Sequence, residues 1–155
     1  MSATAEGTGV AVFVRSGDAL ALSFAIDVSI TALAAGDAVL VGLFQTGLRG
    51  WVDALRGNEA GLEAAEARGV HSNGPRGDRG FRDALRALGG PSLGEAIGRC
   101  RELGAGGRFE VLGCSAAAEA LGMDPDTLVR EGRVDDIVGL PTIWRRARGR
   151  RLLSV

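Results

Sequence analysis

The chain has 155 residues, of which 46% are apolar, and a formal net charge of −1. Its length suits a single domain over residues 1–155, and its composition excludes a disordered chain. No apolar run approaches the roughly 20 residues of a membrane span, and the first residues lack the basic, then apolar, pattern of a secretion signal. We therefore expect a cytoplasmic protein with reduced thiols and no membrane partner. All 18 basic residues are Arg, which excludes a Schiff-base Lys or a phosphate-loop Lys.

The first half of the chain predicts a βαβ unit. Val10–Val14 is a continuous apolar run typical of a buried strand, and Ser16–Asp18 is a turn able to cap a helix. The elements expected next are a very apolar helix at 19–35, a strand at 38–44 and a helix at 46–55. A strand, a helix and a strand within this distance predict parallel pairing with a right-handed crossover.

The second half continues the alternation after a Gly-rich surface excursion at about 56–80. Its expected elements are helices at 81–88 and 91–103, a strand from Phe109, a helix that ends at Gly122, a helical turn from Asp124, a weak strand at 133–138 and a helix at 141–147. This alternation predicts a doubly wound α/β sheet.

Cys114 is the residue with the clearest chemical potential. It follows the apolar run Phe109–Gly113 and precedes a run of small residues, so it is expected at a strand end and at the start of a helix. A helix N-terminus favours the thiolate, the nucleophilic form of Cys. Cys100, in contrast, shares the apolar face of its helix. Because a helix rises about 1.5 Å per residue, Cys100 should lie about 13 Å from the edge that carries Cys114, too far for a disulfide.

Residues at the ends of the first two strands could line a site with Cys114. The candidates, together with the neighbours of the thiol, are Arg15, Ser16, Gly17, Asp18, Phe44, Gln45, Gly113 and Ser115. The alternative for the segment from Arg15 to Asp18 is ordinary turn chemistry with a helix cap. Gly17 lacks the continuation of a dinucleotide-binding loop, so no cofactor is expected.

The remaining candidates have structural alternatives that we favour. His71 is the only His and is expected on a surface loop, and one His with two Cys offers no metal cluster. Trp51 and Trp144 are expected to pack or to contact another subunit. The basic C-terminal run could touch an acidic partner, but we expect a solvated tail and no nucleic-acid binding: Arg145, Arg146, Arg148, Arg150 and Arg151.

The second half of the chain resembles the DsrE/DsrF-like family of small sulfur-relay proteins, including its "peroxiredoxin family" branch. The resemblance rests on Pro91–Leu93, Leu103–Gly104, Gly113–Ser115, Ala120–Asp124 and Gly139–Thr142. It implies a flavodoxin-like three-layer sandwich with about five mostly parallel strands, homo-oligomers such as trimers or hexamers, and protein donors and acceptors of sulfur. It also implies that Cys114 accepts persulfide sulfur and passes it on.

Two other functions stay open on the residues alone. The run Ala116–Ala118 after Cys114 has only small apolar side chains, which fits a non-catalytic oligomeric binding module of the same fold. A thiol redox sensor would need only an exposed Cys114 of low pKa.

Overall fold

The computed structural model describes residues 9–58 and 89–155. His71, the helix expected at 81–88 and nearly all of the 56–80 segment lie outside these residues.

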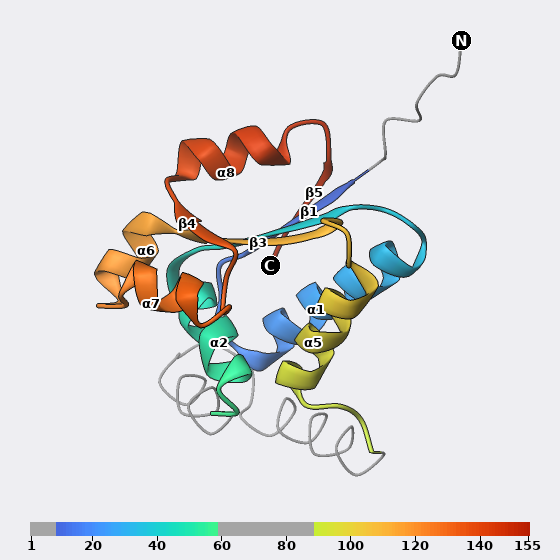
Figure 1. Ribbon diagram of the computed structural model, residues 1–155, viewed down its shortest axis with the longest axis horizontal. Helices are drawn as coiled ribbons and strands as arrows, with labels where there is room; N and C mark the ends of the chain where they lie inside the picture. The colour runs from blue at the N-terminus through green and yellow to red at the C-terminus, as the bar shows by residue number, and fades with distance from the viewer. Residues whose placement is uncertain (1–8, 59–88) are drawn as a thin grey trace, which may run out of the picture.

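Five parallel strands form a single sheet at the centre of the described molecule (Figure 1). They are β1 (Val10–Val14), β2 (Val39–Leu43), β3 (Phe109–Cys114), β4 (Asp136–Val138) and β5 (Arg151–Ser154), in the spatial order β4-β3-β2-β1-β5. The three strands in the middle of this order are the most apolar and are almost fully buried. Continuous apolar strands of this kind need cover on both faces of the sheet.

Helices supply that cover. They are α1 (Ala19–Ala34), α2 (Gln45–Leu55), α5 (Leu93–Leu103), α6 (Ser115–Ala120), α7 (Pro125–Arg130) and α8 (Leu140–Ala147). Among the described helices, α1, α2 and α5 pack on one face, and α8 alone lies on the other (Figure 1). The predicted α/β fold, a flavodoxin-like three-layer sandwich, is confirmed.

The direction of the crossovers explains why α8 lies apart. The chain steps from β1 to β2, β3 and β4 in one direction along the sheet and then returns across it to β5. Because βαβ crossovers are right-handed, a connection that runs in the reverse direction must pass over the opposite face. The helix of that last connection is α8.

The prediction of a solvated C-terminal tail is wrong for Arg151. This residue begins β5, which pairs in parallel with β1 and places Leu152 beside Ala11 and Leu153 beside Val12. The strand is only four residues long and is flanked by Arg, so its sequence lacks the apolar run of the other strands. Its pairing depends on the open edge of β1, which is a feature of the folded sheet.

Side chains fix the helix starts where the sequence predicts caps. The Asp18 carboxylate accepts a hydrogen bond from Ala21 N at 2.8 Å, and Asp124 caps α7 with Pro125 at its first position. The helix expected from Pro91 begins instead at Leu93, because Ser92 and Glu95 form a capping box there. No helix among the described residues has the length and apolarity needed to cross a membrane.

The two Trp residues differ in environment. Trp51 on α2 is fully buried, which confirms its predicted packing role. Trp144 on α8 is 56% exposed and contacts the ring of Phe13, with the two ring centroids 6.1 Å apart.

Candidate functional site

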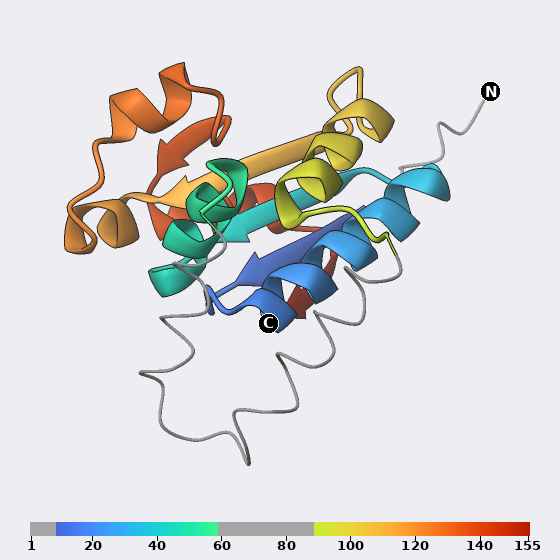
Figure 2. The ribbon, with the colours of Figure 1, turned by 90° about the horizontal axis from the view of Figure 1, so that it is seen from below.

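The carboxyl ends of the five parallel strands lie at one edge of the sheet, where Figure 2 shows the arrowheads of β1, β2, β3 and β4. The loops that leave this edge begin at Arg15 after β1, at Phe44 after β2, at Ser115 after β3 and at Gly139 after β4. In open α/β sheets, ligands bind outside this edge, most often where neighbouring connections lead to opposite faces.

Cys114 is the last residue of β3 and the N-cap of α6. It is 7% exposed, and within the described residues its thiol makes no hydrogen bond or ion pair. Its backbone pairs with Val138 at the end of β4. The predicted position at a strand-to-helix junction is therefore what the structure shows.

The surroundings of Gly113 show on which face of the sheet the Cys114 side chain lies. A Cβ atom at Gly113 would enter the van der Waals shells of Ile137 and of Leu48 on α2. The Gly113 position therefore faces the side covered by α2, and since side chains alternate along a strand, Cys114 faces the side covered by α8. The absence of a side chain at Gly113 leaves room for the side chain of Ile137, its paired residue on β4.

The connections that leave β3 and β4 diverge at Cys114. The chain leaves β3 into α6, which contacts α2, whereas it leaves β4 into α8 on the opposite face (Figure 1). Cys114 and Val138 are the paired residues between these two exits. The thiol thus lies at a topological switch point of the sheet, which is the position expected for a binding site in this fold class.

Sequence reasoning missed the residues on the β4 side of this point. Val138 pairs with Cys114, and the chain continues from it through Gly139 to Leu140, which is 52% exposed. The available signals were the weak strand at 133–138 and the resemblance at Gly139–Thr142, and neither gave the register of this segment against the Cys114 strand.

Cys100 lies elsewhere and has different properties. It is fully buried on α5, its Sγ lies 4.0 Å from the carbonyl oxygen of Ile26, and burial raises its pKa to about 11. Both cysteines are free thiols. The predictions that Cys100 is a core thiol and that no disulfide joins it to Cys114 agree with this structure.

The loop after β1 is held by hydrogen bonds within itself and to α2. Ser16 Oγ donates to the Asp18 carboxylate, Gly17 N donates to Thr46 Oγ1 at 3.1 Å, and Thr46 Oγ1 donates to the Arg15 carbonyl at 3.3 Å. Asp18 also caps α1, and Arg15 is exposed. These contacts serve the turn and the helix cap, which is the structural alternative that the sequence left open.

The structure separates the predicted site residues into two groups. Gly113 and Ser115 flank Cys114, and Phe44 begins the neighbouring loop because Leu43 pairs with Gly113. The loop from Arg15 to Asp18 follows β1, which is two strands away from β3. That distance is roughly 10 Å by ordinary strand spacing.

Phe44 and Gln45 form a sharp corner between β2 and α2. Gln45 has a φ of +47°, a left-handed conformation that is uncommon for a residue with a side chain, and it is exposed at the edge. The Phe44 ring packs edge-on against Phe13, with the centroids 5.0 Å apart. An aromatic cluster of Phe13, Phe44 and Trp144 therefore covers the α8 face of the sheet near its carboxyl edge.

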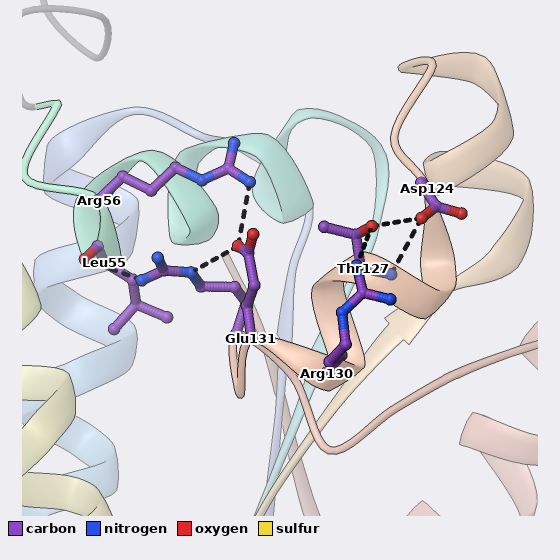
Figure 3. A network of polar contacts seen from close by, with 7 residues as sticks. Leu55, Arg56, Asp124, Thr127, Arg130 and Glu131 are labelled. Carbon is purple, nitrogen blue, oxygen red and sulfur yellow. Dashed lines mark hydrogen bonds and ion pairs between the residues drawn. The ribbon is translucent and has the colours of Figure 1, made fainter.

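Arg side chains attach α6 and α7, the helices that follow Cys114, to α2. Arg49 donates to the carbonyl oxygen of Leu121 at 2.9 Å, at the end of α6. Figure 3 shows the second attachment, in which Glu131 accepts from Arg56 at 3.4 Å and from Arg133 at 3.3 Å. Arg133 also donates to the Leu55 carbonyl at 3.1 Å, so the end of α7 is tied to the end of α2.

Two carboxylates of this region, Glu131 and Asp124, make its stability dependent on pH. Hydrogen bonds from Arg133 and Arg56 lower the pKa of Glu131 below its ordinary value of 4.5, and bonds from Thr127 lower the pKa of Asp124 below 3.8. Because each folded pKa lies below the unfolded one, the stabilisation is fully present above about pH 4.5 and is lost as the pH falls through the folded values.

We expect the urea midpoint to fall between neutral pH and about pH 3, and to fall less for Glu131→Gln. Glu119→Gln is the matched control, since Glu119 is an exposed carboxylate on α6 for which the described residues provide no such bond. An unchanged pH dependence in Glu131→Gln would contradict this assignment.

Within residues 9–58 and 89–155, no group of three His, Cys, Asp or Glu side chains is arranged to hold a metal ion. Comparison of the sequence with protein-family models and with curated proteins gives no match.

Proposed function

We propose that this protein is a small sulfur carrier in which Cys114 accepts and passes on persulfide sulfur. The observation that carries the proposal is the position of Cys114 at the switch point between the ends of β3 and β4. A ligand or partner at this edge would lie close to the thiol, because the edge is where α/β sheets bind their ligands. The resemblance to the DsrE/DsrF-like family points to the same residue.

The chemistry requires a single thiol and no change in total oxidation state. The Cys114 thiolate would attack the outer sulfur of a donor persulfide R–S–SH, a new S–S bond would form on Cys114, and the S–S bond of the donor would break. The donor would leave as the thiolate R–S⁻, and Cys114 would become Cys–S–SH. A downstream thiolate would repeat the same exchange and release Cys114.

The second cysteine does not fit a role in this reaction. Cys100 is fully buried, and its raised pKa of about 11 keeps it as a neutral thiol. A resolving cysteine must reach the first sulfur within disulfide geometry, and both thiols are free here. The proposed protein is therefore a one-thiol carrier that works with donor and acceptor proteins.

A second candidate function is a non-catalytic binding module of the same fold. The observation that favours it is the 7% exposure of Cys114, together with the absence of a polar partner for its thiol among the described residues. Cys114 belongs to the hydrophobic core cluster, as do Ala117 and Ala118 on α6. Burial of this kind slows nucleophilic attack unless a partner opens the site.

Intact-protein mass spectrometry after incubation with glutathione persulfide tests the proposal. We expect the parent chain and Cys100→Ala to gain the mass of one sulfur atom, and Cys114→Ala to gain none. A subsequent excess of a small thiol should remove the added sulfur from both labelled proteins, because the acceptor step is the same exchange reaction.

Other outcomes support the alternatives. A stable sulfenate on Cys114 after peroxide treatment, without sulfur uptake, would indicate a redox sensor. A Cys114 thiol that resists alkylation in the folded protein and reacts only in denaturant would indicate the binding module. Equal sulfur uptake by Cys114→Ala and the parent chain would overturn the assignment of the carrier residue.

A further inference from the structure

Strand β5 is an exposed edge of the described sheet. It pairs with β1 alone, and all four of its residues are exposed, including Leu152 at 46% and Leu153 at 39%. It contains no Pro, and its register with β1 is continuous from Arg151 to Ser154. An exposed apolar edge strand of this kind presents unpaired backbone groups to any other strand, and monomeric proteins usually protect such edges.

The opposite edge of the same sheet is protected. β4 has only three residues, begins with the exposed Asp136 and is followed by Pro141 at the start of α8. Short length, charge and a nearby Pro are ordinary means of preventing edge-to-edge pairing. The contrast indicates that the β5 edge is covered in the working protein.

The free backbone groups of β5 can be identified from its pairing with β1. Arg151 N donates to the Gly9 carbonyl at 2.9 Å, and Val155 N donates to the Phe13 carbonyl at 2.9 Å. In a parallel ladder, alternate residues bond to the same neighbour. The N–H and C=O groups of Leu152 and Ser154 therefore point away from β1, and no described residue pairs with them.

Apolar side chains flank this free edge on both faces of the sheet. On the α1 face, Leu153 lines a hollow of about 540 Å³ with residues of α1 that include Val28 and Thr31. Phe24 lies on the same stripe of α1 and is 52% exposed. On the α8 face, the exposed Leu152 lies on the same side of the sheet as Phe13, against which Trp144 packs.

We propose that β5 pairs antiparallel with β5 of a second copy of this chain, around a two-fold axis at Leu153. In this register Leu152 lies opposite Ser154 of the partner subunit, and Ser154 lies opposite the partner's Leu152. The outward backbone groups of each strand then meet those of the other as two hydrogen-bonded pairs. Leu153 faces the partner's Leu153, and the two five-stranded sheets become one continuous sheet.

The charges beside the edge are compatible with a second copy in this register. Arg151 is exposed and pairs with Asp37 at 3.1 Å, at the amino end of the strand. The antiparallel register places the partner's Arg151 beside Val155, at the other end of the strand, so the two Arg151 side chains do not oppose each other.

The proposed interface does not cover the edge of the sheet at Cys114. β1 and β2 separate β5 from β3, and the antiparallel arrangement places the two carboxyl edges at opposite ends of the dimer. The proposal therefore stands independently of the sulfur-carrier function.

Sedimentation velocity of the full chain over a range of concentrations tests the oligomeric state. We expect a dimer, or a larger assembly built from it. Leu153→Glu should raise the dissociation constant roughly 100-fold, because it removes two buried Leu side chains and opposes two like charges. Val129→Glu is the matched control, since Val129 is 38% exposed on α7 and far from β5, and it should leave the assembly unchanged.

Disulfide trapping tests the register. In a Cys100→Ala, Cys114→Ala background, Leu153→Cys should crosslink two copies, because directly opposite residues of a non-hydrogen-bonded pair have Cα atoms about 4.5 Å apart. Leu152→Cys faces the partner's Ser154 and should not crosslink.

A monomer at every concentration would overturn the proposal, as would a dimer that survives Leu153→Glu or crosslinks more readily through Leu152→Cys. Leu153→Ala, which should weaken the dimer about tenfold, decides the matter if Leu153→Glu does not fold.

Discussion

Gly50→Ala is expected to lower the free energy of unfolding by about 2–4 kcal/mol, whereas Gly98→Ala should raise it by about 0.5–1 kcal/mol. Both glycines lie inside helices, Gly50 in α2 and Gly98 in α5. Helix propensity alone favours Ala at each position. The opposite signs follow from what surrounds each Cα atom.

A Cβ atom at Gly50 would lie 2.5 Å from the Cα atom of Gly17 and 2.6 Å from its carbonyl oxygen. These are backbone atoms of the loop after β1, so no flexible side chain can move aside. A Cβ atom at Gly17 or Gly47 would likewise come within the van der Waals distance of a backbone carbonyl oxygen. The three glycines let α2 approach the β1 loop closely. At Gly98, a Cβ atom meets nothing within 4 Å.

Urea denaturation followed by circular dichroism measures both effects. Each variant differs from the parent chain by one methyl group in a helix, so the pair isolates the close backbone contact from helix propensity. A Gly50→Ala variant as stable as Gly98→Ala would show that α2 does not lie against the β1 loop as described.

Trp51→Ala is expected to cost about 3–5 kcal/mol of unfolding free energy, the largest effect of any side-chain truncation proposed here. Trp51 is the largest of the fully buried side chains and lies on the inner side of α2. Its removal would leave a cavity between α2 and the sheet that the surrounding side chains fill only in part. Trp144→Ala is the matched control and should cost about 1 kcal/mol, since that ring is 56% exposed.

Trp51→Phe separates volume from polarity at the same position. The indole Nε1 is buried and finds no acceptor among the described residues. A buried donor without a partner costs about 1–3 kcal/mol, and Phe removes that donor while it keeps most of the ring volume. We therefore expect Trp51→Phe to lie within about 1.5 kcal/mol of the parent chain. A loss as large as that of Trp51→Ala would mean that the indole makes an interaction that this structure does not show.

The sequence predicted the parts of the fold that depend on local patterns. The apolar runs at Val10–Val14 and Phe109–Gly113 are strands, and the caps at Asp18 and Asp124 start helices where the residue types indicated. The prediction that Cys100 is a core thiol was also confirmed, because the apolar face of a helix packs against the core. These features follow from hydrogen-bonding and burial rules that act within a few residues.

The candidate site was predicted only in part, for reasons of register. The position of Cys114 at the end of a strand could be predicted, whereas Val138 as its neighbour could not, because three residues of a weak strand do not define a pairing. Likewise, nothing in the spacing of Gly17, Gly47 and Gly50 indicated that they share one close contact. Contacts between segments far apart in the chain are decided by how the elements dock.

The sequence by itself determined an alternating α/β domain with a thiol at a strand-to-helix junction. Only the tertiary structure decided that this thiol lies at the switch point beside β4, and that the last residues form an edge strand. The physical reason is that β5 is only four residues long, with two Leu between Arg151 and Ser154, and is held by backbone hydrogen bonds to the open edge of β1. That edge exists only after the sheet has assembled.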